Sequence, residues 1–422
     1  MSGAWTPPVR PAAARALHAA AEAERAAHPE RYRLDPAAVL ARALGEEPAE
    51  ALGDGDWRAG FERYLGSAAE DGRLNALGTR MAGDAAAGRL RARLAMARHL
   101  TATPALLERP VRAPIVITGG WRTGTTFLFR LLATDPRLRA PLPAELGAPW
   151  RLGPLRGAER EAAIDRAAAH HERLHALNPA LAVVHDSGAR LPEECVLAMG
   201  TDFRNWGFPS TVRLDGYAAW LEGEPFGGAY RRYRAMLQAL DAGDGRRWLL
   251  KAPAHLAALP SLVAAFPGAC IVHLHRDVVE TIASGASLFA VFRSTYSDAV
   301  DPVDVGRFQT AQTALWLDRA LAFRAGEGLR GSARFVDLDY RALVADPIAA
   351  ARRVYAAADL ELPASVVAGF EHYGRAHRQH ARGRHHYDPA QFGLDPGALH
   401  ERFTRYEERF GLRTADAPHE AR

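Results

Sequence analysis

The sequence predicts an α/β fold: a P-loop-like parallel sheet with flanking helices, preceded by a helical N-terminal extension. Short apolar runs rich in β-branched residues recur from residue 113 onward, and helical stretches separate them. Strands that alternate with helices pair in parallel, because each helix returns the chain to the same edge of the sheet. A glycine-containing loop joins the first run to a helix, and only helix-type patterns precede that run.

Residues 1–112 are expected to form the helical extension. Asp35, which precedes a proline, and Asp56 are expected to start helices, because aspartate accepts hydrogen bonds from the free amides of a first turn. The extension is interpreted as a cap on the rest of the chain or as the surface of a homodimer. Apolar residues recur at helical spacing in three of its segments, 35–44, 56–65 and 70–100.

Residues 113–422 are expected to form the second unit. The first apolar run is typical of a strand buried on both faces of a parallel sheet. Residues 150–245 predict a helical insertion that contains several aromatic residues. The four runs that predict strands are 113–118, 246–251, 269–276 and 333–339.

The composition excludes several classes of protein. Of the 422 residues, 48% are apolar and 24% charged, which rules out global disorder. A net charge of +4 is too small for a dedicated nucleic-acid binder. Residues 252–275 carry no formal charge, but prolines interrupt them, so we expect no transmembrane segment. Two cysteines in apolar contexts, Cys195 and Cys270, and an N-terminus without a signal-peptide pattern favour a cytoplasmic location.

Lys251 is the single lysine among 53 basic residues. Lysine and arginine exchange at little cost on a solvated surface, but not at a site that needs a compact ammonium group. Lys251 ends a predicted strand, and open α/β sheets bind ligands at the carboxyl ends of their strands. We therefore interpret Lys251 as functional; the alternative is a chance remnant of a bias toward arginine.

The loop after the first predicted strand has the pattern of a phosphate site. It reads GGWRTGTT over residues 119–126 and opens a helix. The amides and dipole of a helix start attract anions, and glycines let a phosphate approach the backbone closely. Thr125 stands where a Walker A motif needs lysine, which argues against the alternative of a P-loop kinase or NTPase.

A second anion site is predicted at the end of the strand 269–276. Arg276 ends this strand, and Ser284 follows about two helical turns later. The two side chains are placed to hold one phosphate. The alternative is a surface ion pair between Arg276 and Asp277, with Asp277 as a helix N-cap.

Together these motifs resemble those of the PAPS-dependent sulfotransferases, most closely the bacterial sulfotransferase-family proteins. The resemblance extends over roughly residues 50–410. It implies the sulfotransferase fold and transfer of a sulfuryl group from 3′-phosphoadenylyl sulfate (PAPS) to a hydroxyl or amine of a small-molecule or lipid acceptor. The motifs are R-T-G-T-T at 122–126, L-P-E-E-C at 191–195, K-A-P at 251–253, and F-P-x-A-x-x-V-x-x-x-R-D at 266–277.

The resemblance also implies roles for individual residues. The loop residues match those that hold the 5′-phosphosulfate, the pair Arg276 and Ser284 matches the 3′-phosphate site, and Tyr340 matches a tyrosine near the base. Arg382 and Gly383 match, more loosely, a late loop over the 3′-phosphate, and residues 370–395 are expected to form a cationic lid. The matching loop residues are Arg122, Thr123, Gly124, Thr125 and Thr126, followed by Phe127, where the family often places an aromatic residue against the adenine.

Sulfuryl transfer explains why an ammonium is kept. Negative charge grows on the bridging oxygen of the departing adenosine 3′,5′-bisphosphate, and catalysis needs a cation there. A compact ammonium on a flexible stem follows that oxygen better than a wide guanidinium, which assigns this role to Lys251. The donor carries less charge at the transferred group than Mg·ATP, so we expect no metal.

The acceptor hydroxyl also needs a general base. The four candidates are Glu145, His185, Glu194 and His255. Each has a structural alternative: a surface acid for Glu145, a buried imidazole for His185, an ion pair for Glu194 and a helix cap for His255. We favour Glu145 or His185.

Two questions about function stay open. An inactive nucleotide-binding scaffold is a further alternative to an enzyme, and the retained lysine argues against it. The acceptor is not specified by the sequence, although the aromatic residues of 150–245 indicate an apolar pocket or an ordinary helical core.

Overall fold

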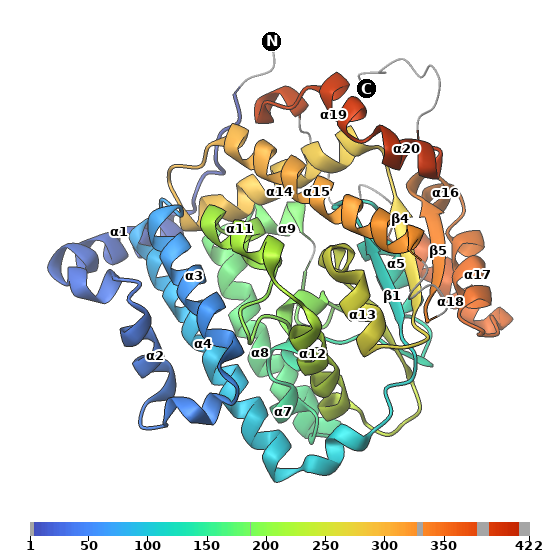
Figure 1. The fold of residues 1–422 in the computed structure, drawn as a ribbon, viewed down its shortest axis with the longest axis horizontal. Helices are drawn as coiled ribbons and strands as arrows, with labels where there is room; N and C mark the ends of the chain where they lie inside the picture. The colour runs from blue at the N-terminus through green and yellow to red at the C-terminus, as the bar shows by residue number, and fades with distance from the viewer. Residues whose placement is uncertain (1–3, 186, 327–331, 378–387, 413–422) are drawn as a thin grey trace.

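The structure is a computed structural model that describes residues 4–185, 187–326, 332–377 and 388–412 (Figure 1). It contains a five-stranded, fully parallel sheet in the order β2-β3-β1-β4-β5. The predicted α/β fold with flanking helices is confirmed. The strands are β1 Ile115–Gly119, β2 Leu138–Arg139, β3 Arg247–Lys251, β4 Cys270–His275 and β5 Arg334–Asp339.

The predicted strands form the four longer members of this sheet. Every residue of β1, β3 and β4 is buried, as expected for strands covered on both faces. Ile115 pairs with Leu249 of β3 on one side and with Cys270 of β4 on the other. The edge strand β2 was not predicted, because two residues are too few to show a periodic pattern.

The helices surround the sheet, and in Figure 1 the N-terminal helices α1–α4 lie on the side opposite the strands. Those N-terminal to β3 are α1 Ala12–Ala27, α2 Pro36–Leu44, α3 Arg58–Glu70, α4 Ala76–Ala102, α5 Thr125–Leu132, α6 Pro143–Gly147, α7 Pro149–Leu152, α8 Gly157–Leu177, α9 Leu181–Val184, α10 Gly207–Thr211, α11 Asp215–Gly223 and α12 Gly227–Leu240. Those that follow are α13 Leu259–Ala265, α14 Val278–Tyr296, α15 Pro302–Ala325, α16 Tyr340–Ala345, α17 Pro347–Ala357, α18 Ala364–Ala376, α19 Pro396–Arg402 and α20 Thr404–Phe410.

One of the two predicted helix starts is correct. The Asp35 carboxylate accepts a hydrogen bond from the amide of Ala38 and caps α2. Asp56 does not cap α3, because its carboxylate binds the guanidinium groups of Arg93 and Arg232 instead.

The N-terminal helices share the core of the rest of the chain. Leu65 of α3 and Leu90 of α4 belong to the same buried apolar cluster as Val116 of β1. The first turn of α4 touches the end of α14, where a Cβ on Gly78 would lie 2.0 Å from the Tyr296 carbonyl oxygen. Only glycine permits this approach, so Gly78 allows the backbone of α4 to pack directly against the end of α14. Within the described ranges, no helix has the length and apolarity needed to cross a membrane.

Candidate active site

A cavity of about 2130 Å³ opens along the carboxyl edge of the sheet. The ends of β1, β3 and β4 meet there, which places the three sequence motifs around one space. Most of the predicted site residues line this cavity: Arg122, Gly124, Thr125, Thr126, Phe127, His185, Glu194, Arg276, Ser284 and Tyr340.

The segment of residues 119–126, called the phosphate loop after its predicted role, joins β1 to the first turn of α5 as expected. Gly124 caps α5 with φ +89°, and a Cβ there would also lie 3.0 Å from Leu343 Cδ2. Arg122 has φ +62°, a left-handed conformation that costs a non-glycine residue about 1–2 kcal/mol. Such strain is typical of functional loops. The Thr123 hydroxyl donates to the Gly120 carbonyl at 2.8 Å and is buried, so this side chain holds the loop together and does not line the cavity.

Arg276 reaches from the end of β4 to the phosphate loop. Its guanidinium donates to the Arg122 carbonyl at 2.8 Å and lies 4.2 Å from the centre of the Tyr340 ring. Its ion pair is with Glu280 at 2.7 Å, while Asp277 caps α14 through the Glu280 amide. The alternative of an ion pair between Arg276 and Asp277 is therefore wrong, and the helix N-cap that accompanied it is correct.

Aromatic side chains form the wall next to Phe127. The ring of Tyr373, on α18, lies 6.2 Å from that of Phe127 and stacks on His377 at 4.0 Å. Tyr373, Arg375 and His377 line the cavity. All three fall in the expected lid segment, although the sequence pattern did not single out Tyr373. Arg382 and Gly383 lie outside the described residues.

Lys251 lies where the motifs converge. It is 1% exposed, and its ammonium donates to Glu194 Oε1 at 2.5 Å and to Thr126 Oγ1 at 3.1 Å. Both partners line the cavity, so the ammonium contacts the cavity wall from within the protein. The single lysine thus connects the end of β3 with the phosphate loop and the LPEEC segment.

His185 and Glu193 form a second pair beside Glu194. His185 Nε2 lies 3.4 Å from Glu193 Oε2, and both residues line the cavity. Burial disfavours a charge on His185, but the Glu193 carboxylate outweighs it and raises the pKa of His185. Burial also works against Glu193, yet the His185 pair and Lys251 lower its pKa to about 2.

The remaining two base candidates do not line the cavity. Glu145 is buried among Arg139 at 3.0 Å, Arg160 at 2.8 Å and the Leu142 amide at 3.0 Å. We therefore correct its predicted role from base to structural ion pair.

His255 is also buried, with Nδ1 2.7 Å from the Tyr230 hydroxyl. Burial lowers its pKa to about 3, which makes it a neutral core imidazole rather than a base.

Three contributors to the cavity are not predicted by the sequence motifs. Glu193 lines the cavity beside Glu194, the residue that the motif indicated as a candidate base. Arg130 lies four residues after Thr126, a spacing that places it on the same face of α5, and it lines the cavity. Helix α4 supplies a whole wall, for which the sequence offers no local signal.

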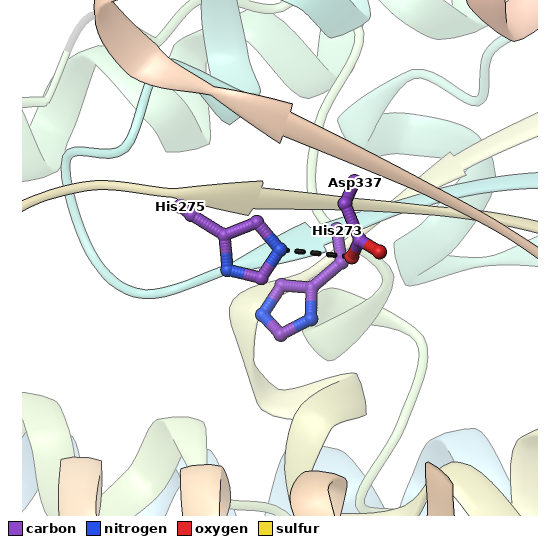
Figure 2. A group of neighbouring side chains, drawn as sticks. All are labelled: His273, His275 and Asp337. Carbon is purple, nitrogen blue, oxygen red and sulfur yellow. Dashed lines mark hydrogen bonds and ion pairs between the residues drawn. The ribbon is translucent and has the colours of Figure 1, made fainter. Parts of the chain in front are cut away.

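Among the residues that the structure describes, two groups of side chains could ligate a metal ion, because the potential ligand atoms within each group lie within 4.8 Å of one another. They are His273, His275 and Asp337, and Asp277, His400 and Glu407. In the first, Figure 2 shows His275 Nε2 directed at Asp337 Oδ1, 2.9 Å away. Both Asp337 oxygens also accept hydrogen bonds from Arg324 at 2.7 Å. A fixed guanidinium repels a divalent cation, so we interpret this group as a network that holds the end of β4, next to Arg276, against β5.

Comparisons with known proteins agree with this geometry. A family model described as the sulfotransferase family matches residues 114–364, more than half of the chain. None of the curated proteins compared with the chain matches it. Sulfotransferase STF1 from Mycobacterium tuberculosis is 27% identical with a TM-score of 0.75, and the match covers 88% of this chain and 97% of that one. Sulfotransferase STF9 from Mycobacterium avium is 25% identical with a TM-score of 0.77, covering 91% and 97%. The chain belongs to the sulfotransferase family.

Proposed function

We propose that this protein transfers a sulfuryl group from PAPS to the hydroxyl of a small-molecule acceptor. The observation that carries the proposal is the position of Lys251. Its ammonium lies between a hydroxyl of the phosphate loop, Thr126, and a carboxylate of the cavity wall, Glu194. Family membership supports sulfuryl transfer, and the donor and acceptor are inferred from the chemistry of the site.

The site fits a donor with two separate anionic groups. The N-terminus of α5, with Thr125 and Thr126, lines the cavity and suits the 5′-phosphosulfate. Arg276 and Ser284 lie on the β4 side and suit the 3′-phosphate. Phe127 and Tyr373 both line the cavity, where an aromatic ring can pack against an adenine.

The reaction moves one sulfuryl group and one proton. The acceptor oxygen forms a bond to sulfur while the bond from sulfur to the bridging phosphate oxygen breaks. Lys251 stabilises the negative charge that develops on that bridging oxygen, in a buried site where such a charge interaction is strong. Adenosine 3′,5′-bisphosphate leaves, and the acceptor proton passes to a base.

His185 is the base in this proposal. Glu193 binds Nε2 and orients the ring, which leaves Nδ1 as the proton acceptor. The Glu193 carboxylate raises the pKa of His185, which makes its neutral imidazole a stronger base. Glu194 serves as the counter-ion of Lys251 until the donor binds.

Ligand-induced stabilisation tests the donor. Adenosine 3′,5′-bisphosphate should raise the melting temperature more than Mg·ATP does, because a ligand stabilises the state that binds it. A larger effect of Mg·ATP would favour the kinase or NTPase alternative, and no effect of either would favour an inactive scaffold. Transfer of ³⁵S from labelled PAPS to a mixture of alcohols then tests the reaction itself.

A further inference from the structure

The cavity extends past His185 into a chamber between α4 and α14. Each helix contributes one stripe of side chains at spacings of three or four residues, the pattern of a single helix face. The stripe on α14 consists of Ser284, Leu288, Phe289, Phe292 and Tyr296. The stripe on α4 consists of Leu77, Arg80, Met81, Asp84, Ala85, Gly88, Arg89 and Ala92.

Helix α14 gives the direction and depth of this chamber. The ring of Phe289 lies 4.8 Å from Trp121 of the phosphate loop, and the ring of Phe292 lies 6.1 Å from His185. The carbonyl of Tyr296 accepts a hydrogen bond from the Asn75 amide at 3.0 Å, where α4 begins. From Ser284 to Tyr296 the helix rises by about 18 Å. The chamber therefore leads from the phosphate region, past His185, to the junction of α4 and α14.

The walls of the chamber are mostly apolar. Arg80, Asp84 and Arg173 line the cavity but are exposed, which places them at its rim. The Arg89 guanidinium is less exposed and donates to the carbonyls of Leu197 and Met199 at 2.6 and 3.0 Å.

The wall opposite α4 and α14 contains polar as well as apolar residues. Its polar members donate hydrogen bonds to backbone carbonyls: Asn205 to Val196, Ser210 to Trp206 and Thr211 to Gly207. Its apolar members are Leu181, Val184, Val196, Leu197, Phe208 and Val212.

We infer that the acceptor is an elongated apolar alcohol, with its hydroxyl at His185 and its apolar body between α4 and α14. A polyhydroxylated acceptor would bury hydroxyls against carbon, at a cost for each hydrogen bond left unmade. An alkyl body loses nothing there and gains from leaving water. Helix α4 of the N-terminal extension is then a wall that selects the acceptor. This inference rests on the proposed function for the position of the hydroxyl.

A series of primary alkanols tests the chamber without the donor. Binding of 1-hexanol, 1-octanol, 1-decanol and 1-dodecanol to the full chain is measured by isothermal titration calorimetry, with glucose as the polar comparison. Affinity is expected to rise by up to about fourfold for each added methylene, and glucose should not bind. Equal affinity along the series, or tighter binding of glucose, would overturn the inference.

Gly88 offers a substitution that reaches into the chamber. A Cβ at Gly88 meets no atom within 4 Å, so Gly88→Leu adds a side chain without displacing the protein, and it replaces a glycine inside a helix. Gly66→Leu is the matched control, because Gly66 is also inside a helix, has the same free space and does not line the cavity. Gly88→Leu should weaken 1-dodecanol binding at least tenfold, and Gly66→Leu should leave it unchanged. The same effect of both variants would count against the chamber.

The donor assay separates this inference from the proposed function. If adenosine 3′,5′-bisphosphate stabilises the protein but alkanol binding does not depend on length, the acceptor class is wrong and the proposed function stands. If the alkanols bind as expected but neither the nucleotide nor labelled sulfate is recognised, the chamber stands and the proposed reaction is wrong.

Discussion

The ammonium of Lys251 lies 2.5 Å from Glu194 Oε1, and no part of the lysine is more than marginally exposed. The carboxylate lines the cavity, whereas the ammonium approaches it from the protein side. A donor that brings its own negative charge to Lys251 must therefore compete with Glu194. In the absence of the donor, Glu194 compensates the charge of the buried ammonium. The competition between Glu194 and the donor leads to the first two predictions.

Lys251→Arg should keep the fold and the binding of adenosine 3′,5′-bisphosphate, but lower kcat by about 10²–10³-fold, the usual cost of losing one donor to a developing charge. The guanidinium keeps the charge but is too wide to take the place of the ammonium between Thr126 and Glu194. Melting temperature, nucleotide binding and turnover of labelled PAPS check the three parts. Turnover at the parent rate would show that the lysine is a chance remnant.

Glu194→Gln should destabilise the protein without ligand by about 1–3 kcal/mol, because it leaves a buried charge less well compensated. Adenosine 3′,5′-bisphosphate should then stabilise this variant more than the parent, since the nucleotide no longer competes with a carboxylate. Urea unfolding with and without the nucleotide measures both effects. A smaller ligand effect in the variant would contradict the competition, and a complete loss of turnover with normal nucleotide binding would indicate Glu194 as the base.

Activity should rise with pH through the pKa of His185. Below this pKa the imidazole is protonated and cannot accept the acceptor proton; above it the neutral form is available. Because Glu193 raises the pKa, Glu193→Gln should move the acidic limb of the kcat/KM profile to lower pH, and His185→Ala should remove this limb. A profile that is unchanged in both variants would rule out His185 as the base.

Glu145→Ala should lower the free energy of unfolding by about 3–5 kcal/mol, the usual cost of removing one partner of a buried pair. Arg139 is nearly as buried as Glu145 and would lose its counter-ion. The fraction that remains folded should have the kcat/KM of the parent, measured well below the melting temperature. A loss of turnover without a loss of stability would restore Glu145 as the base candidate.

Local patterns were sufficient for the four longer strands and for the loop between β1 and α5. The apolar run at 113–118 needs burial on both faces wherever it occurs, and the loop that follows needs glycine at φ +89° wherever the helix begins. The same kind of reasoning failed for Asp56, because two arginines distant in sequence bind its carboxylate. It also failed for β2, which exists only because Leu138 and Arg139 pair with β3.

The candidate bases show the limit most clearly. Glu145, His185, Glu194 and His255 are all titratable residues in comparable local contexts. The neighbours that separate them come from elsewhere in the chain: Arg160 for Glu145, Tyr230 for His255 and Lys251 for Glu194.

By itself, the sequence determined the parallel α/β sheet and the glycine loop between β1 and α5, and it singled out Arg276, Ser284 and Lys251 as site candidates, because each follows from short-range spacing and side-chain chemistry. Only the tertiary structure decided that His185 and Glu193 share the cavity, that Glu145 and His255 do not line it, and that α4 forms one of its walls. These features depend on contacts between segments far apart in the chain, and burial and charge pairing at such contacts leave no periodic trace in the residues that make them.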